Sequence, residues 1–370
     1  MLSYLPFQED NYMERYNRHI RLEAIGLQGQ KRLLAAKVMV IGAGGLGCPV
    51  LQYLAAAGIG TLGIMDNDVV EISNLQRQTL FRTSDIGSSK AIAAKKHLGD
   101  LNPEIQIIAH NKKLNAQNAL ELLKPYDIIV DGTDNFEARY WINDATVILN
   151  KPMIYGAIYK FEGQVTVFNH QDGPSYRCLF PTPPKPLSIP NCEELGVLGV
   201  LPGIIGTLQA NETLKILLNI GMPLVGKLLC YNTLTHAQSL IGIPRNDQCI
   251  QEVKARKTLL ETEASFECEA VPQLNFLEAI KKDNVQFIDL RSPEEQPKLP
   301  LEELLYIPLS ELKSRINELT PYANYVFFCQ SGTRSKTAVR LMLQQKVKNC
   351  FSLMEGAPEI HQLLEQIKTA

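Results

Sequence analysis

VMVIGAGGLGCPV, residues 38–50, decides the fold, because here a short apolar run breaks into glycines and then becomes apolar again. Gly42, Gly44 and Gly47 stand at the G-x-G-x-x-G spacing. Such glycines let the backbone turn tightly after a strand and approach a phosphate, and the helix that follows offers free N–H groups to it. Tight strand–helix packing alone can also require this spacing. The stretch therefore predicts a strand–loop–helix unit and leaves open which nucleotide it binds.

Outward from this stretch, apolar strands and helical segments alternate. The segments expected to be strands are KVMVI, GTLGIMD, EIQIIAH and YDIIVDGTD, and MIYGAIYKFEGQVTVF is expected to form an antiparallel pair. This alternation predicts an α/β fold with a Rossmann-like, doubly wound parallel sheet. A proline-rich stretch at 170–199 predicts a long loop, which in a compact domain is more often functional than idle.

A charged and less periodic stretch divides the chain into two parts. We expect a first domain over residues 1–255, a linker over 256–271 and a smaller α/β domain over 272–370. The smaller domain shows its own alternation, with VQFIDLR and NYVFF as buried strands.

Composition excludes several classes of function. The chain has 370 residues and a net charge of -2, so no basic field points to nucleic acid or to an anionic membrane. The start has no signal-peptide pattern, and the longest apolar tract, residues 38–65, is interrupted by too many glycines for a membrane span. Eight cysteines are scattered along the chain, which is typical of reduced thiols in a cytoplasmic protein.

Polar residues after the strands indicate which nucleotide the glycine loop holds. Asp66 ends the second strand, where a carboxylate grips the ribose of any adenosine cofactor. Asn74, Arg77 and Lys90 follow it, and Asp134 ends a later strand. Cations that stabilise phosphoryl oxygens and a carboxylate that holds Mg²⁺ suit cleavage of ATP, whereas hydride transfer has little use for them. Taken singly, each residue could be a surface ion pair; together they favour ATP and Mg²⁺.

The motifs RYNRHIRL, GAGGLG, DNDVVEISNLQRQTLF, GSSKA and DGTDN resemble those of the ubiquitin-activating-enzyme-like adenylyltransferases of the MoeB and ThiF type. The resemblance covers roughly residues 11–243. It implies that ATP and Mg²⁺ are used to adenylate the C-terminal glycine of a ubiquitin-like sulfur carrier protein, of the MoaD or ThiS type, with release of pyrophosphate. A carrier ending in Gly-Gly is the implied partner.

The resemblance also implies residue roles. Gly45 would lie at the α-phosphate, Asp66 would hold the ribose, and Asp134 would bind Mg²⁺. The residues implied to meet the phosphates are Asn74, Arg77 and Lys90. Arg18 would reach across a homodimer into the partner's site; a solvated helix charge is the alternative.

In many members of this family two C-x-x-C pairs bind a structural zinc. The corresponding segments here are SYRC, residues 175–178, and NDQC, residues 246–249, so only Cys178 and Cys249 remain. Two thiolates do not complete a tetrahedral site, and we expect this remnant to be empty of Zn²⁺. Rescue by His170 or Asp247 is the alternative. The resemblance further implies that Cys192, at the end of the proline-rich loop, bonds transiently to the activated carrier; an incidental loop cysteine is equally open.

FFCQSGTRSKTAV places Cys329 after a buried strand and before a helix, with Arg334 in the turn. Amides aimed inward at a helix N-terminus stabilise an anion and lower the pKa of such a cysteine. The C-x4-R loop is one residue shorter than that of cysteine phosphatases and suits a persulfide sulfur better than a phosphoryl group. CQSGTRS, with FIDLRSPEE and YIPLSEL upstream, resembles a rhodanese domain over about residues 272–368. Asp289 and Arg291 are expected to be structural.

These observations predict an enzyme, an adenylyltransferase with a sulfurtransferase domain. It would turn the carrier's terminal carboxylate into a thiocarboxylate for molybdopterin or thiamine biosynthesis. The resemblance implies a homodimer, and a sulfur donor such as a cysteine desulfurase would load Cys329. Two alternatives are a dehydrogenase that uses NAD and a non-catalytic scaffold that binds a ubiquitin-fold partner.

Overall fold

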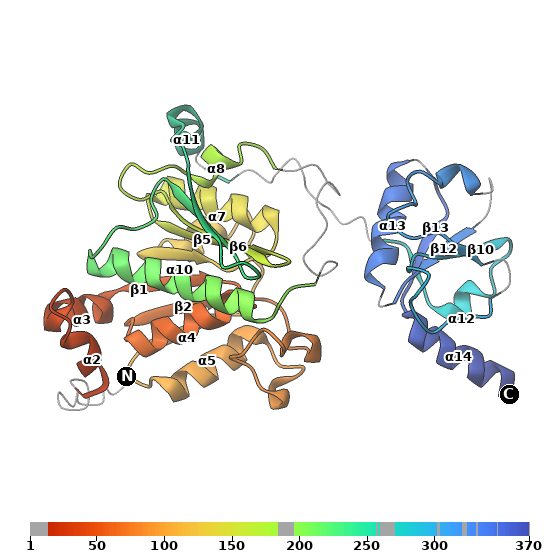
Figure 1. The fold of residues 1–370 in the computed structure, drawn as a ribbon, viewed down its shortest axis with the longest axis horizontal. Coiled ribbons are helices and arrows are strands. Elements are labelled where there is room, and N and C mark those ends of the chain that lie inside the picture. The colour runs from red at the N-terminus through yellow and green to blue at the C-terminus, as the bar shows by residue number, and fades with distance from the viewer. Residues whose placement is uncertain are drawn as a thin grey trace. The chain divides into compact units, whose positions relative to one another are not determined.

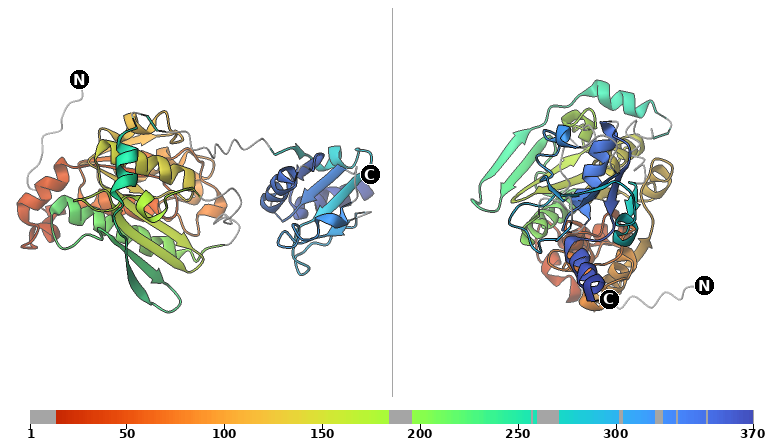
Figure 2. Two further views of the ribbon diagram at one scale, coloured as in Figure 1. Left: turned by 90° about the horizontal axis from the view of Figure 1, so that it is seen from above. Right: turned by 90° about the vertical axis from the view of Figure 1, so that its right-hand side faces the viewer.

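The structure is a computed structural model. It describes residues 14–183, 196–256, 258–259, 271–301, 304–319, 324–330, 332–345 and 347–369. The described residues up to 259 form one compact unit and those from 271 onward form another (Figures 1 and 2).

The first unit is built on an eight-stranded sheet with the order β3-β2-β1-β4-β5-β6-β7-β8. The strands are β1 (Lys37–Ile41), β2 (Thr61–Met65), β3 (Gln106–His110), β4 (Ile128–Asp131), β5 (Met153–Tyr159), β6 (Glu162–Phe168), β7 (Lys227–Asn232) and β8 (Gln238–Gly242). β3, β2, β1, β4 and β5 run parallel, and β5 to β8 pair antiparallel. The doubly wound fold expected from the alternation is confirmed.

Helices cover both faces of this sheet. They are α2 (Asn17–Ile20), α3 (Gly26–Ala35), α4 (Gly47–Ala57), α5 (Lys90–Leu101), α6 (Ala119–Leu123), α7 (Phe136–Leu149), α8 (Tyr176–Leu179), α10 (Val200–Leu218) and α11 (Asp247–Lys254), with 3-10 turns at Ile72–Asn74 and Thr83–Asp85. Successive residues of a strand point to opposite faces. Val40 accordingly joins a core with α3, α4, α5 and α10, while Met39 joins a second core with α6 and α7.

The second unit has a five-stranded parallel sheet with the order β11-β10-β12-β13-β9. Its elements are β9 (Gln273–Leu274), α12 (Phe276–Ala279), β10 (Val285–Asp289), β11 (Leu305–Tyr306), a 3-10 turn (Ile316–Glu318), β12 (Asn324–Phe328), α13 (Thr333–Gln344), β13 (Cys350–Leu353) and α14 (Ala357–Thr369). The apolar strand β12 contributes Phe327 to one core and Phe328 to the other. A smaller α/β domain, as expected, is confirmed.

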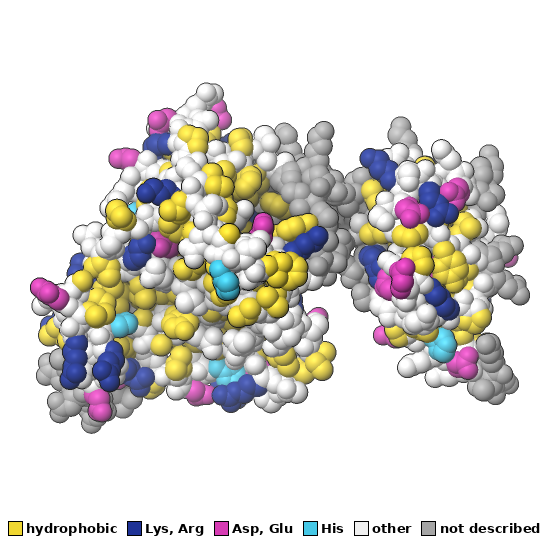
Figure 3. Space-filling view, viewed as in Figure 1, with side chains coloured by type: hydrophobic (Ala, Val, Ile, Leu, Met, Phe, Trp, Pro, Cys, Tyr) yellow, Lys and Arg dark blue, Asp and Glu magenta, His cyan; other side chains and the backbone are white. Residues whose placement is uncertain are grey.

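Charged side chains of both signs are scattered over the face drawn in Figure 3, with no single basic field on it. This agrees with the small net charge of the chain. Among the described helices, none is both long and apolar enough to cross a membrane.

Candidate active site

The glycine loop lies where the strand order of the first sheet reverses. β1 pairs with β2 on one side and β4 on the other, so the loop after β1 opens into the crevice at the carboxyl ends of the strands. Ligands of doubly wound sheets bind in this crevice. A Cβ on Gly47 would lie 1.8 Å from the carbonyl oxygen of Gly42, and Gly42 itself has a φ of +91°. Both positions therefore require glycine for the backbone path itself.

Asp66, directly after β2, is bonded to this loop. One carboxylate oxygen accepts a hydrogen bond of 2.7 Å from the amide of Ala43, and the other accepts one of 2.8 Å from the amide of Asp68. Burial raises the pKa of the Asp66 carboxyl, although the two amides and Lys90 favour its charged form. An acceptor is thus held beside the glycines, which suits the hydroxyl groups of a ribose.

Arg77 lies against the glycine loop at Gly45. A Cβ on Gly45 would lie 3.6 Å from Cγ of Arg77, and the guanidinium donates to the carbonyl of Ser73 at 3.0 Å. Asn74 is buried in the preceding 3-10 turn, where its side-chain oxygen accepts from the amide of Glu71. The turn therefore presents Arg77 to the loop on a fixed backbone.

Lys90 is the first residue of α5 and is buried, with 8% of its side chain exposed. Its ammonium lies 2.9 Å from a carboxylate oxygen of Asp68, which is itself 61% exposed. A buried cation whose partner reaches into solvent can exchange that partner for a phosphate without leaving a carboxylate buried and unpaired.

Asp134 is exposed in the segment between β4 and α7. Gly132 brings this segment to the glycine loop, since a Cβ on Gly42 would lie 2.7 Å from the carbonyl oxygen of Gly132. In the described parts of the chain no three His, Cys, Asp or Glu side chains gather in a way that could hold a metal ion. A lone carboxylate nevertheless fits Mg²⁺, which commonly takes one or two carboxylates plus phosphates and water.

In the second unit Cys329 is fully buried directly after β12, and its carbonyl accepts from the amide of Ala357. Arg334, in the first turn of α13, forms a two-pronged ion pair with Glu295 at 2.5 and 2.7 Å. The Arg334 guanidinium holds the pKa of Glu295 at about 2. The arginine expected to serve an anion loop is therefore engaged by a carboxylate. Asp289 and Arg291 pair at 2.7 Å, both buried, as structural residues do.

Comparison with known proteins assigns both units. Residues 16–251 match the ThiF family and residues 274–363 match the rhodanese-like domain. The chain belongs to the ThiF family. It is an adenylyltransferase with a sulfurtransferase domain, so the expected enzyme class and the family resemblance are confirmed.

Three relatives and one solved structure illustrate the similarity. A "Sulfur carrier protein adenylyltransferase" of Thermus thermophilus is 51% identical over 242 residues, covering 64% of this chain and 89% of that relative. A "Probable molybdopterin-synthase adenylyltransferase" of Porphyra purpurea is 41% identical over 342 residues, covering 90% of this chain and 89% of the relative. "Adenylyltransferase and sulfurtransferase MOCS3" of Arabidopsis thaliana is 41% identical over 327 residues, covering 83% of this chain and 70% of the relative. A crystal structure of E. coli MccB with MccA-N7isoASN has a TM-score of 0.57 at 24% identity, covering 63% of this chain and 72% of that one, and shows the fold alone.

Two further site residues were expected in this ThiF-family chain, Arg18 and Cys192. Arg18 is exposed on α2. Cys192 lies outside the described residues.

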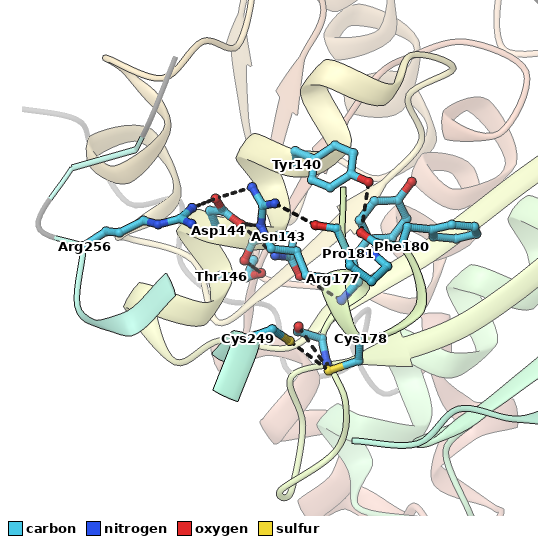
Figure 4. Close-up of polar contacts among 12 residues, drawn as sticks. Tyr140, Asn143, Asp144, Thr146, Arg177, Cys178, Phe180, Pro181, Cys249 and Arg256 are labelled. Atoms are coloured by element: carbon cyan, nitrogen blue, oxygen red, sulfur yellow. Dashed lines mark hydrogen bonds and ion pairs between the residues drawn. The ribbon is translucent and has the colours of Figure 1, made fainter. Parts of the chain in front are cut away.

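The remnant zinc segments meet in space. Cys178 on α8 and Cys249 on α11 place their sulfurs 3.6 Å apart (Figure 4). Burial opposes ionisation of Cys178, but hydrogen bonds from the Ser175 hydroxyl and from the amides of Asn246 and Ser175 hold its pKa below its ordinary value. Burial raises the pKa of the Cys249 thiol, and the Cys178 sulfur adds to this shift. Neither His170 nor Asp247 forms a group of three ligands with these thiols in the described structure.

Sequence reasoning missed two residues at the ThiF-family crevice and one at the rhodanese-like loop. Arg139 on α7 is buried, donates to the carbonyl of Thr133 at 3.0 Å and has its Nε 3.7 Å from Asp131. Gln209 on α10 donates to the carbonyl of Asp131 at 2.7 Å. The residue at the rhodanese-like loop is Glu295, which forms the ion pair with Arg334. A charged residue inside the apolar pattern of α7 was the one available signal for Arg139.

Proposed function

We propose that this chain adenylates the C-terminal glycine of a ubiquitin-like sulfur carrier and then converts it to a thiocarboxylate with sulfur carried on Cys329. The observation that carries the first half is the meeting of the glycine loop, Asp66 and Arg77 at the point where the strand order reverses. The names of the Thermus and Porphyra relatives support the carrier and the molybdopterin pathway respectively. Thiamine biosynthesis is the alternative pathway, and a cytoplasmic location suits either.

In the adenylation step a carboxylate must approach a highly charged triphosphate. Backbone amides of the loop and the start of α4 would hold the α-phosphate near Gly45, and Asp66 would accept from the ribose. Arg77 and Lys90 would neutralise the phosphoryl oxygens, with Asn74 fixing the turn that carries Arg77. Mg²⁺, bound through Asp134, would supply further charge neutralisation on the departing pyrophosphate.

In the sulfur-transfer step the terminal sulfur of a Cys329 persulfide attacks the carbonyl carbon of the acyl-adenylate. The C–O bond to the phosphate breaks and AMP leaves, so that an acyl disulfide joins the carrier to Cys329. Attack by the Cys192 thiol on the Cys329 sulfur would release the thiocarboxylate and leave a Cys192–Cys329 disulfide. A cysteine desulfurase is the proposed sulfur donor, and Arg334 would stabilise the anion at the loop.

Exchange of labelled pyrophosphate into ATP tests the first step. With the full chain, Mg²⁺ and a carrier ending in Gly-Gly, we expect exchange that disappears when the carrier is omitted or lacks its last glycine. Exchange without any carrier would refute the adenylation proposal, and NADH binding without ATP binding would select the dehydrogenase alternative.

The second step is tested separately. Cys329→Ala should abolish transfer of sulfur from thiosulfate to cyanide and leave the carrier-dependent exchange unchanged. Cys350→Ala is the matched control, since Cys350 is also buried in this unit but lies on β13. Loss of both activities in a folded Cys329→Ala protein would contradict the division of labour.

A further inference from the structure

Cys178 and Cys249 are the feature that adenylation and sulfur transfer leave unused. Their sulfurs lie 3.6 Å apart although the residues are 71 positions apart in the chain. Both are free thiols and both are partly exposed. A reagent in solution can therefore reach a pair of thiols that the fold has already brought together.

The surroundings of this thiol pair fit a sulfur nucleophile. Amide N–H groups of Ser175 and Asn246 each donate to the Cys178 sulfur at 3.3 Å, and the Ser175 hydroxyl lies 3.5 Å from it. These donors stabilise a thiolate, and two sulfurs alone fall short of the four ligands of a structural zinc site. Cys249 makes its own contact with the carbonyl of Asn246, at 3.1 Å.

The two elements that carry the thiols are held together independently of the sulfurs. On α7, Asp144 accepts from Arg177 at 2.6 and 2.8 Å and from Arg256, which follows α11, at 3.0 Å (Figure 4). The two thiols also pack against a small apolar cluster formed by Val147, Ile250 and Val253. Because this packing fixes the approach of α8 and α11, a bond of about 2.0 Å between the sulfurs requires only a small side-chain adjustment.

We propose that Cys178 and Cys249 form a reversible disulfide that fastens α8 to α11 when the protein meets a low-molecular-weight disulfide. The Cys178 thiolate attacks one sulfur of oxidised glutathione, whose S–S bond breaks, and one glutathione thiolate leaves. The Cys249 thiol, on losing its proton to solvent, attacks the Cys178 sulfur and expels the second glutathione. The two electrons pass to glutathione, and a reducing thiol reverses both steps.

The bond would close the chain between α8 and α11 into a covalent loop that contains α10, β7 and β8. Cross-linking residues so far apart in the chain removes much conformational freedom from the unfolded state. Oxidation should therefore stabilise the first unit.

The test treats the full reduced protein with oxidised glutathione, blocks free thiols and maps peptides without reduction. We expect one cross-linked peptide joining Cys178 to Cys249 and a rise in the melting temperature of the first unit of roughly 5 °C, both reversed by dithiothreitol. Cys230→Ser is the matched control, since Cys230 is a half-buried thiol on β7, and it should keep the cross-link. Cys249→Ser should instead retain glutathione on Cys178, because it lacks the second thiol.

Two outcomes would overturn the proposal. One is a wild-type protein that retains glutathione on Cys178 as Cys249→Ser does. The other is a reduced wild-type protein that binds one zinc ion per chain and loses it in Cys249→Ser. The melting temperatures of the reduced variants, compared with that of the reduced wild-type protein, show whether the variants fold. The comparison of wild-type melting temperature before and after oxidation does not depend on any variant.

Discussion

At the residue scale, the proposed adenylation site relies on cations beside the glycine loop. Lys90 is buried; its ion-pair partner Asp68 is mostly exposed, and its ammonium also favours the charged form of the Asp66 carboxyl. We expect Lys90→Ala to lower carrier-dependent pyrophosphate exchange roughly 100-fold or more. Lys95→Ala, an exposed position on the same helix, should leave exchange unchanged. Equal exchange rates in the two variants would remove Lys90 from the site.

A second residue-scale prediction concerns pH. The bidentate hydrogen bonds from Arg334 hold the pKa of Glu295 at about 2, below its ordinary value of 4.5. A depressed carboxyl pKa contributes stability that is fully present above the unfolded value and is lost as pH falls through the folded value. We therefore expect Glu295→Gln to melt below wild type at pH 7, with the difference shrinking between about pH 4.5 and pH 2.

Calorimetry of the full chain measures this difference for the rhodanese-like unit. Glu294→Gln, at the exposed neighbouring position, is the control and should match wild type throughout. A gap between Glu295→Gln and wild type that stays constant with pH would mean that the ion pair with Arg334 does not stabilise the unit.

At the element scale, the change in stability when a glycine is replaced by alanine depends on which atoms the added Cβ would contact. A Cβ at Gly47 would lie 1.8 Å from the Gly42 carbonyl oxygen, whereas at Gly99 in α5 nothing lies within 4 Å. We expect Gly47→Ala to destabilise the first unit by about 3 kcal/mol or more. Gly99→Ala should stabilise it by about 0.5–1 kcal/mol through helix propensity.

Urea unfolding followed by tryptophan fluorescence measures the stability of the first unit. The single tryptophan of the chain, Trp141, is buried in α7 of that unit. The two midpoints should move in opposite directions. If both variants shift alike, the loop backbone tolerates a side chain and the steric argument for glycine fails.

Elements were also the scale at which the sequence was most informative. Alternating apolar strands and helices indicate a parallel sheet, since each βαβ crossover has one favoured hand. The strand order then reverses at β1, which pairs with both β2 and β4. The antiparallel pair β5 and β6 follows from one apolar stretch with a short turn. The contacts of Arg334 with Glu295 join residues 39 positions apart, and no local pattern encodes such a pairing. Arg139 was missed for a related reason, because its charge is satisfied only after α7 packs beside β4.

At the scale of the whole molecule, the family resemblance implies an active site that needs residues from two chains. Arg18 is exposed on α2, and the family resemblance implies that it completes the site of a partner subunit in a homodimer. Arg18→Ala and Lys90→Ala should then each be inactive in pyrophosphate exchange. In a dimer containing one of each, the site with an intact Lys90 receives an intact Arg18 from the other chain, whereas its counterpart lacks both.

Mixing the two variants therefore gives a defined result. After dissociation and random reassociation at equal concentrations, about half of the dimers are mixed and each has one complete site, so exchange should return to about a quarter of the wild-type rate. Arg21→Ala, another exposed charge just beyond α2, serves as the control and should be active by itself. A mixture that stays inactive while size-exclusion shows dimers would mean that Arg18 acts within its own chain. A monomer in solution would end the shared-site proposal outright.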